Sequence, residues 1–252
     1  MFMIYKKNFG QNFLVSQSIA KKIADRSNIH PGETILEIGS GKGILTQFLL
    51  EKGAHVISFE IDRDLFAFLE EKFKGMDIEF VFEDFLKFSG IIKADKCVSN
   101  IPYNISTPII KKLFDLDIPV SILMVQKEYA KRLFASPSTE EYGSLSIFVQ
   151  VRSKVEYLFD VDRSSFYPKP KVDSSVIKIT RTDEFQKKIK NMERFEEIVR
   201  MSFSQRRKMI KNNLKGIELF IEKAGISPTQ RAEEIPIDKF IELSNLLSDD
   251  TL

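Results

Sequence analysis

The sequence predicts an α/β protein with a parallel sheet in a larger N-terminal domain and a smaller, all-helical C-terminal domain. Apolar strand-like runs alternate with helix-like segments between residues 34 and 134. This alternation is the pattern of a parallel sheet with helices on both faces. Beyond Arg181 the remaining segments look helical, and none looks like a strand. We therefore expect two domains, residues 1–182 and residues 183–252.

The expected helices and strands follow from local patterns along the chain. Ile19, Ala20 and Ile23 share one face of a helix predicted over residues 16–27. Short apolar runs bounded by turn residues predict strands at 34–38, 55–61, 78–82, 96–99, 120–125, 145–151, 155–159 and 176–180. The segments between and after these strands predict helices at 44–52, 63–73, 107–114, 127–134, 185–215, 217–223 and 236–247.

Composition excludes several classes of protein. A length of 252 residues suits one large domain with a small one, and 43% hydrophobic residues supply a full core. The single cysteine, Cys97, argues against disulfides and thiolate metal sites, and in a buried strand it should be inert. Two histidines, His30 and His55, cannot build a histidine metal site, so we expect no metal. No run reaches membrane-spanning length and no signal peptide is recognisable, which favours a cytoplasmic protein.

A glycine-rich turn, EIGSGKG at residues 37–43, joins the first strand of the predicted sheet to a helix. Gly39 and Gly41 let the backbone approach a ligand, which the helix N-terminus then faces. Glu60 ends the next strand, where a carboxylate can hold both ribose hydroxyls. Asp84 follows the third strand and can accept from an adenine amino group. These features predict a nucleoside site, although the turn alone also fits dinucleotide enzymes or a plain tight turn.

The segment NIPY, residues 100–103, ends a later strand of the same sheet. The Asn100 side-chain oxygen and the Pro102 carbonyl can accept both hydrogens of an exocyclic amino group, and Tyr103 can stack on the base. Holding these hydrogens counters delocalisation of the nitrogen lone pair, and the ammonium that forms loses its proton without a nearby base. Catalysis then comes mainly from alignment with a positively charged methyl donor. The segment therefore predicts methyl transfer to a nucleobase amino group.

Two further segments carry candidate RNA contacts. In FYPKPKV, residues 166–172, two prolines stiffen a turn; Phe166 could cover the opposite face of the base, and Lys169 and Lys171 could meet phosphates. Residues 200–217 hold no acid and six cations, namely Arg200, Arg206, Arg207, Lys208, Lys211 and Lys215. We expect these cations to follow an RNA backbone in a salt-dependent manner, with a solvated helix face as the alternative.

The motifs closely resemble the small-subunit ribosomal RNA adenine N6-dimethyltransferases of the kasugamycin-resistance methyltransferase type. The resemblance covers nearly the whole chain and rests on FGQNFL (9–14), EIGSGKG (37–43), FEID (59–62), NIPYNIS (100–106) and FYPKPKVDS (166–174). It implies a Rossmann-like methyltransferase domain that depends on S-adenosylmethionine, with a small C-terminal helical domain. It also implies the residues that hold this donor, which are Asn12, Leu14, Gly39, Glu60, Asp84 and Asn100.

By the same resemblance, the expected reaction dimethylates two adjacent adenosines in a 3′-terminal hairpin of small-subunit ribosomal RNA, inside an assembling subunit. No feature of the sequence indicates an oligomer, so we expect a monomer. The erythromycin-resistance methyltransferases share most of these motifs and modify a large-subunit adenine; residues 126–133, 203–208 and 231–233 favour the small-subunit enzyme. The expected fold would also suit a binding protein with idle chemistry, such as an assembly checkpoint, or a NAD oxidoreductase. The NIPY segment argues against both.

Overall fold

The computed structural model describes residues 12–249, and these residues form two compact units. The first, called the sheet unit, comprises residues 12–130 and 156–181. The second, called the helical unit, comprises residues 131–155 and 182–249. The chain therefore enters the helical unit twice, because residues 131–155 belong to it together with the C-terminal segment.

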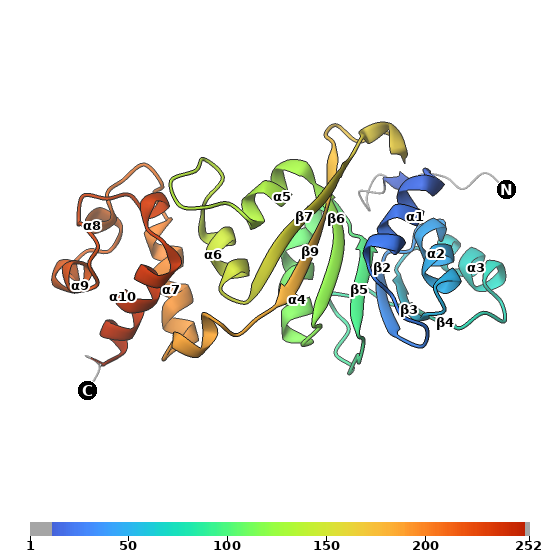
Figure 1. The fold of residues 1–252 in the computed structure, drawn as a ribbon, viewed down its shortest axis with the longest axis horizontal. Coiled ribbons are helices and arrows are strands. Elements are labelled where there is room, and N and C mark those ends of the chain that lie inside the picture. Colours follow the sequence, from blue (N-terminus) through green and yellow to red (C-terminus); the bar gives the residue numbers. More distant parts are fainter. Residues whose placement is uncertain (1–11, 250–252) are drawn as a thin grey trace. The chain divides into compact units, whose positions relative to one another are not determined.

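The sheet unit contains a large sheet, which Figure 1 shows with its helices, and a small sheet of two strands. Its strands are β1 (Phe13–Leu14), β2 (Thr34–Ile38), β3 (His55–Glu60), β4 (Ile78–Phe82), β5 (Lys96–Asn100), β6 (Val120–Gln126), β7 (Ser153–Val161), β8 (Phe166–Tyr167) and β9 (Ser174–Arg181). Its helices are α1 (Gln17–Arg26), α2 (Ile44–Glu51), α3 (Arg63–Lys72) and α4 (Ser106–Asp115), with α5 (Lys127–Leu133) leading out of it. Short 3-10 turns cover Tyr103–Ile105 and Arg163–Ser165.

The larger sheet has the strand order β4-β3-β2-β5-β6-β9-β7. The strands from β4 to β6 are parallel, and β9 runs antiparallel to β6. After β2 the chain builds outward through β3 and β4, then returns to place β5 on the other side of β2. This reversal is a topological switch point, and ligands bind beside the carboxyl ends of the strands at such points.

One face of this sheet is closed by α1 and α2. Ala20 and Ile23 of α1 and Leu45 and Leu49 of α2 pack in one buried cluster with strand residues such as Val98. Ser16 caps α1 through its side-chain oxygen, and Asp62 does the same for α3, as expected of such residues at helix starts. Because these helices and the sheet share one buried core, the strand ends that carry the loops are held in fixed positions.

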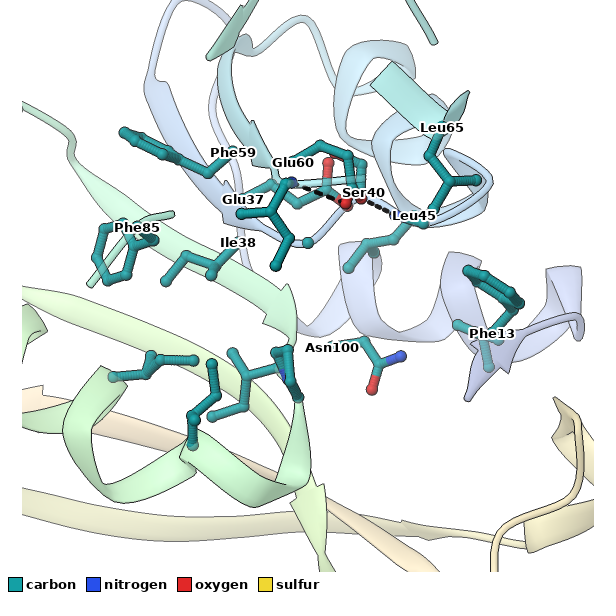
Figure 2. Close-up of a pocket in the computed structure, with 18 of the residues that line it drawn as sticks. Phe13, Glu37, Ile38, Ser40, Leu45, Phe59, Glu60, Leu65, Phe85 and Asn100 are labelled. Carbon is teal, nitrogen blue, oxygen red and sulfur yellow. Dashed lines mark hydrogen bonds between the residues drawn. The ribbon is translucent and has the colours of Figure 1, made fainter. Parts of the chain in front are cut away.

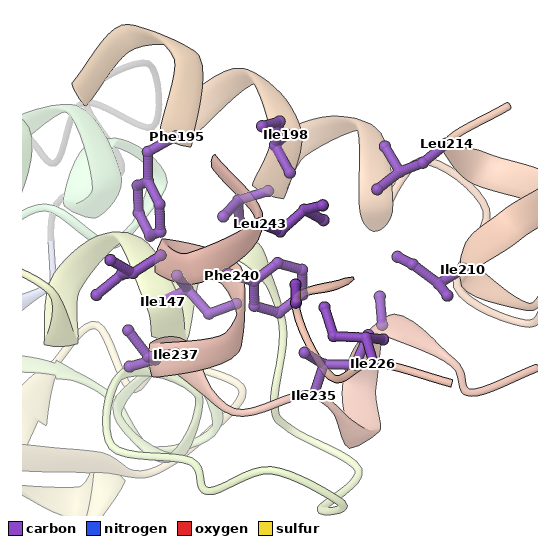
Figure 3. Close-up of a cluster of buried hydrophobic side chains, with 14 of the residues drawn as sticks. Ile147, Phe195, Ile198, Ile210, Leu214, Ile226, Ile235, Ile237, Phe240 and Leu243 are labelled. Atoms are coloured by element: carbon purple, nitrogen blue, oxygen red, sulfur yellow. The ribbon is translucent and has the colours of Figure 1, made fainter. Parts of the chain in front are cut away.

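The helical unit packs around Phe240 (Figure 3). Its elements are α6 (Ser144–Gln150), α7 (Met192–Ser202), α8 (Ile210–Asn213), α9 (Glu218–Lys223) and α10 (Ile237–Asp249), with 3-10 turns at Gln186–Lys188 and Ala232–Glu234. Ile147 from α6 joins Phe195 and Ile198 from α7 in this core. The core therefore needs residues from both stretches of the unit.

The strand predicted at residues 145–151 is wrong, because this segment forms α6. The Ser146 hydroxyl accepts from the Gly143 N–H at the helix start and donates to the Arg132 carbonyl. Gln150 donates to the carbonyls of Leu133 and Ala135. The apolar run favoured a strand, but hydrogen bonds of the polar residues to the end of α5 and the residues just after it, together with the core around Phe240, favour the helix.

The single helix predicted over residues 185–215 is also wrong. Asn191 caps a new helix by accepting from the Arg194 N–H, and α7 ends at Ser202. Asn213 donates to the carbonyls of Ser202 and Gln205, which holds the chain in turns between α7 and α8. Residues 206–208 therefore lie in a loop and not on a continuous basic helix. In the described part of the chain, no helix is long and apolar enough to cross a membrane.

Candidate active site

A pocket opens at the switch point of the sheet unit, beside the carboxyl ends of β2, β3 and β5 (Figure 2). The glycine turn after β2, the loop after β4 and the residues before β1 complete its wall. The pocket brings together nine residues that the sequence singled out: Asn12, Leu14, Gly39, Gly41, Glu60, Asp84, Asn100, Pro102 and Tyr103. Residues 9–11 of the FGQNFL motif lie outside the described residues.

The glycine turn is held from behind by α3. Gly39, Gly41 and Gly43 all have positive φ angles, between 57° and 76°, which glycine adopts without steric cost. A Cβ placed on Gly43 would lie only 2.5 Å from Cε2 of Phe73. The Lys72 ammonium donates to the carbonyls of Lys42 at 2.9 Å and Gly43 at 3.4 Å. The end of α3 therefore fixes the turn through both packing and hydrogen bonds.

Glu60 occupies the end of β3 and is 5% exposed. One carboxylate oxygen accepts from the N–H groups of Ile61 and Asp62, each at 2.9 Å, and the other accepts from the Gly41 N–H at 3.3 Å. Burial raises the pKa of Glu60, while these N–H donors oppose the shift. The carboxylate is thereby anchored at the pocket wall, and the oxygen that accepts only from the Gly41 N–H keeps a lone pair for a ligand hydroxyl.

Glu37 is a pocket residue that the sequence reasoning did not single out. It is the last residue but one of β2, is 2% exposed and accepts from the Thr46 hydroxyl at 2.7 Å. Burial raises its pKa to about 7, and hydrogen bonds from Thr46 and Ser58 oppose the shift. Its position as the first letter of EIGSGKG was the available signal, because an acid near the end of a buried strand is unusual unless it meets a partner.

Asp84 lies in the loop after β4, where its carboxylate accepts from the Leu86 N–H at 3.0 Å. This is the loop-cap geometry that the sequence allowed as an alternative, and it leaves the second carboxylate oxygen for a ligand. Lys112 of α4 donates to the carbonyls of Phe85 and Phe88 in the same loop. The loop that carries Asp84 is therefore tied to the sheet unit by a lysine, as the glycine turn is.

Asn100 supplies the most informative atom of the pocket. Its side-chain oxygen is buried and has no hydrogen-bond partner among residues 12–249. Figure 2 shows the Asn100 amide projecting into the open centre of the pocket. Burying an amide oxygen without a partner costs about 1–3 kcal/mol, so this acceptor indicates a donor group on a ligand.

Tyr103 lines the same pocket, and its hydroxyl lies 2.5 Å from the Ser174 hydroxyl. Burial raises the pKa of Tyr103 to about 12. The phenol therefore stays protonated at neutral pH and acts through its ring and as a neutral hydrogen-bonding group. Ser174 is fully buried on β9 and holds the ring at the end of β5.

Phe166 is not one of the residues that line the pocket. It pairs with Leu14 in the antiparallel β1–β8 ribbon, is 3% exposed and packs in the core with α1 and α2. Its assignment as the second stacking ring stays a prediction that no contact in the structure supports. Lys169 and Lys171, in the turn after β8, are exposed.

Four of the six cations in residues 200–217, which the sequence predicts to contact RNA, lie between residues 206 and 211, and they differ from one another. Arg206 is engaged: it pairs with Glu233 at 2.6 Å and donates to the Glu140 carbonyl. Arg207, Lys208 and Lys211 are exposed and form no ion pair with any residue between 12 and 249. Three of the four cations are therefore available for an anionic partner, while Arg206 ties the loop to its own unit.

The pocket suits S-adenosylmethionine. Glu37 near the end of β2, Glu60 at the end of β3, Asp84 after β4 and the glycine turn match a charged nucleoside with amino and hydroxyl donors. Among the described residues, no group of three or more His, Cys, Asp or Glu side chains could hold a metal ion. The fold and this pocket define a Rossmann-like methyltransferase that depends on S-adenosylmethionine.

Comparison with known proteins gives the family. The model of the ribosomal RNA adenine dimethylase family matches residues 4–249, so the chain belongs to this family and is an adenine dimethyltransferase of ribosomal RNA. The ribosomal RNA small subunit methyltransferase A of Thermotoga maritima is 40% identical over 94% of this chain and 84% of its own length. The protein of the same name from Lactobacillus johnsonii is 41% identical over 98% of this chain and 92% of its own.

Two solved structures are similar over nearly the whole chain. A dimethyladenosine transferase from Plasmodium falciparum has a TM-score of 0.80 and 27% identity, covering 94% of this chain and 98% of its own. The 23S rRNA methyltransferase ErmE has a TM-score of 0.72 and 27% identity, and the similarity covers 94% of this chain and 100% of ErmE. The fold is therefore similar to that of a dimethyladenosine transferase and to that of a 23S rRNA methyltransferase.

Proposed function

We propose that the enzyme transfers methyl groups from S-adenosylmethionine to the N6 amino groups of two adjacent adenosines in a 3′-terminal hairpin of small-subunit ribosomal RNA. The observation that carries this proposal is the buried, unpartnered Asn100 oxygen beside Pro102 and Tyr103. An adenine amino group supplies the missing donor, and the Tyr103 ring covers the base. The names of the relatives that share about 40% of the sequence support the small subunit as substrate.

The residues around the glycine turn hold the donor. Gly39 and Gly41 give it room along the backbone, Glu60 accepts from a ribose hydroxyl through its less occupied oxygen, and Asp84 accepts from its adenine amino group. Asn12 and Leu14 close the pocket from the β1 side. When bound, S-adenosylmethionine supplies a methyl group on a positively charged sulfur. The acids that line the pocket favour this positive charge.

Asn100 and Pro102 prepare the target nitrogen. The Asn100 oxygen accepts one amino hydrogen, and the Pro102 carbonyl accepts the other in place of one of its long bonds from the Ile105 N–H and the Ser106 hydroxyl, each at 3.3 Å. Holding both hydrogens draws the nitrogen lone pair out of conjugation with the base. Tyr103 stacks on the base and holds it in line with the donor. The base must leave its stack to reach this pocket, a step that enzymes acting on nucleobases commonly use. Phe166, as the second stacking ring, would need the β1–β8 ribbon to shift when the base enters.

Arg207, Lys208 and Lys211 would contact RNA phosphates from the helical unit, with Lys169 and Lys171 doing so from the sheet unit. Arg206 would contribute only after leaving Glu233. We further propose that the protein acts as a cytoplasmic monomer on an assembling small subunit, where methylation forms a step of ribosome biogenesis. The similarity to ErmE favours one specific alternative, a large-subunit adenine as the target.

The test is methyl transfer from labelled S-adenosylmethionine to unmethylated small ribosomal subunits, with large subunits in parallel and nucleoside analysis of the product. We expect N6,N6-dimethyladenosine in small-subunit RNA, lost in Asn100→Ala. Label only in large-subunit RNA would replace the proposal with a large-subunit target. A second experiment asks whether Asn100→Ala complements a deletion strain. Complementation would favour a checkpoint role, because a purely structural function does not need catalysis. Failure to complement would show that catalysis is required.

A further inference from the structure

The β1–β8 ribbon presents its four side chains on two opposite faces. Directly paired residues of antiparallel strands point to the same side. Leu14 pairs with Phe166, and both are buried, at 6% and 3% exposure. Phe13 pairs with Tyr167, which places these two rings together on the other face. The ribbon thus has one face in the core and one aromatic face turned away from it.

The aromatic face continues the pocket wall. Phe13 lines the pocket, where its ring lies 3.1 Å from the position a Cβ would take on Gly41 (Figure 2). Its neighbour Tyr167 is 66% exposed, and its hydroxyl has no hydrogen-bond partner among residues 12–249. Tyrosine is enriched at interfaces, where its ring supplies apolar contact area and its hydroxyl stays in water. A free ring beside the pocket lip is therefore available to a partner.

The charges around Tyr167 favour an anionic partner. Lys169 and Lys171 follow it in the chain, are exposed and form no ion pair within the part of the chain that the structure describes. Two acids lie nearby. Asp162 accepts from the Ser164 N–H at 2.7 Å and interacts electrostatically with Lys169, and Asp173 accepts from the Arg163 N–H at 3.1 Å. An aromatic ring flanked by exposed cations is the usual composition of a single-stranded nucleic acid site.

We propose that Tyr167 stacks on an RNA base that neighbours the adenine entering the pocket, while Lys169 and Lys171 contact the adjoining phosphates. A base that leaves its helix exposes the faces of its neighbours, and an aromatic ring at the pocket lip can replace the lost stacking partner. Tyr167 then positions the strand without touching the reacting nitrogen. The inference rests on RNA as the substrate, and it is independent of which ribosomal subunit supplies that RNA.

The test compares Tyr167→Ala, Tyr167→Phe and Tyr167→Leu with the unchanged enzyme on unmethylated ribosomal subunits. Stacking on one base contributes about 1–3 kcal/mol, so Tyr167→Ala should raise KM for the subunit by about fivefold or more. Tyr167→Phe should stay within about twofold because its ring is kept. The affinity for S-adenosylhomocysteine, measured by calorimetry, should be the same in all variants, since the donor pocket is untouched.

Tyr157→Ala is the matched control, because Tyr157 is also exposed, at 50%, on β7 of the same unit. It should leave KM for the subunit unchanged. An unaffected Tyr167→Ala, or a Tyr167→Leu enzyme with the original KM, would overturn the stacking role. Equal losses of S-adenosylhomocysteine affinity and subunit KM would instead make Tyr167 a support of the donor pocket. If the unchanged enzyme labels only large subunits, the same comparison is made on that RNA.

Discussion

The Tyr103 hydroxyl and the Ser174 hydroxyl meet at 2.5 Å, although 71 residues separate them in the chain. The contact joins the turn after β5 to the first residue of β9. Since Ser174 is fully buried and β9 pairs with β6 over its whole length, the ring of Tyr103 is held by the rigid centre of the sheet. This hydrogen bond joins the last residue of the NIPY motif to the last residue of the FYPKPKVDS motif.

Removing either hydroxyl should slow methyl transfer more than it weakens donor binding. Ser174→Ala leaves the buried Tyr103 hydroxyl unpaired, a penalty of about 1–3 kcal/mol. We expect a lower kcat and a lower melting temperature, with the affinity for S-adenosylhomocysteine nearly unchanged. Tyr103→Phe in the Ser174→Ala background should cost less than in the unchanged enzyme, because the partner is already absent. Additive effects in this double-mutant cycle would contradict the coupling.

Lys72→Met should weaken donor binding although Lys72 does not line the pocket. Its ammonium ties down the carbonyls of Lys42 and Gly43 and faces the buried Glu37. Because hydrogen bonds from charged groups are among the stronger ones, a loss of roughly threefold to tenfold in S-adenosylhomocysteine affinity is expected for this partly exposed group. Lys74→Met, an exposed lysine just beyond the same helix, is the control and should bind normally. Normal binding by Lys72→Met would remove the positioning role.

Glu37→Gln should change the pH dependence of stability. Burial raises the pKa of Glu37 from 4.5 to about 7, so the folded protein holds this proton more tightly than the unfolded chain. Its contribution to stability is therefore lost as the pH rises from about 4.5 to about 7. The melting temperature of Glu37→Gln, relative to the unchanged protein, should be higher at pH 8 than at pH 5. A difference independent of pH would mean that Glu37 titrates normally.

Gly43→Ala should destabilise the fold far more than Gly75→Ala. Both glycines have positive φ, at 71° and 79°, so each substitution carries a backbone cost of about 1–2 kcal/mol. Only at Gly43 would the new Cβ also meet neighbours, with Phe73 at 2.5 Å and Leu69 at 2.9 Å. Overpacking adds about 1–3 kcal/mol. Urea unfolding of the two variants measures the difference, and equal midpoints would show that the turn accommodates the methyl group.

Lys208→Gln and Arg206→Gln should have different effects. Lys208 is exposed without an ion pair in the described residues, so its loss should weaken RNA binding and lower the slope of log affinity against log salt by about one. Arg206 pairs with Glu233 and the Glu140 carbonyl, so its loss should mainly destabilise the helical unit. Salt titrations of RNA binding, together with thermal unfolding, distinguish the two. If the salt dependence of RNA binding were reduced in Arg206→Gln and not in Lys208→Gln, then Arg206 and not Lys208 would be the RNA contact.

Much of the fold could be predicted because its signals are local. Strand and helix periodicity within a few residues predicted the parallel strands β2 to β6 and the helices between them, and β9 was predicted as a strand whose direction was left open. Turn chemistry predicted the glycine turn and the NIPY segment, and the order of strands placed Glu60 and Asp84 at the same sheet edge. Each of these features depends on residues that lie close together in the chain.

Several features depend instead on partners that are distant in the chain. The apolar run at residues 145–151 is equally compatible with a strand, and α6 forms because Ser146 and Gln150 donate to carbonyls at the end of α5. Phe166 faces the core and Tyr167 the solvent only because the ribbon pairs with β1 in one register. Composition and periodicity determined the class of fold and the chemistry of the pocket. Tertiary packing alone decided which side chains are free and which are engaged, because burial and pairing depend on contacts that no local pattern encodes.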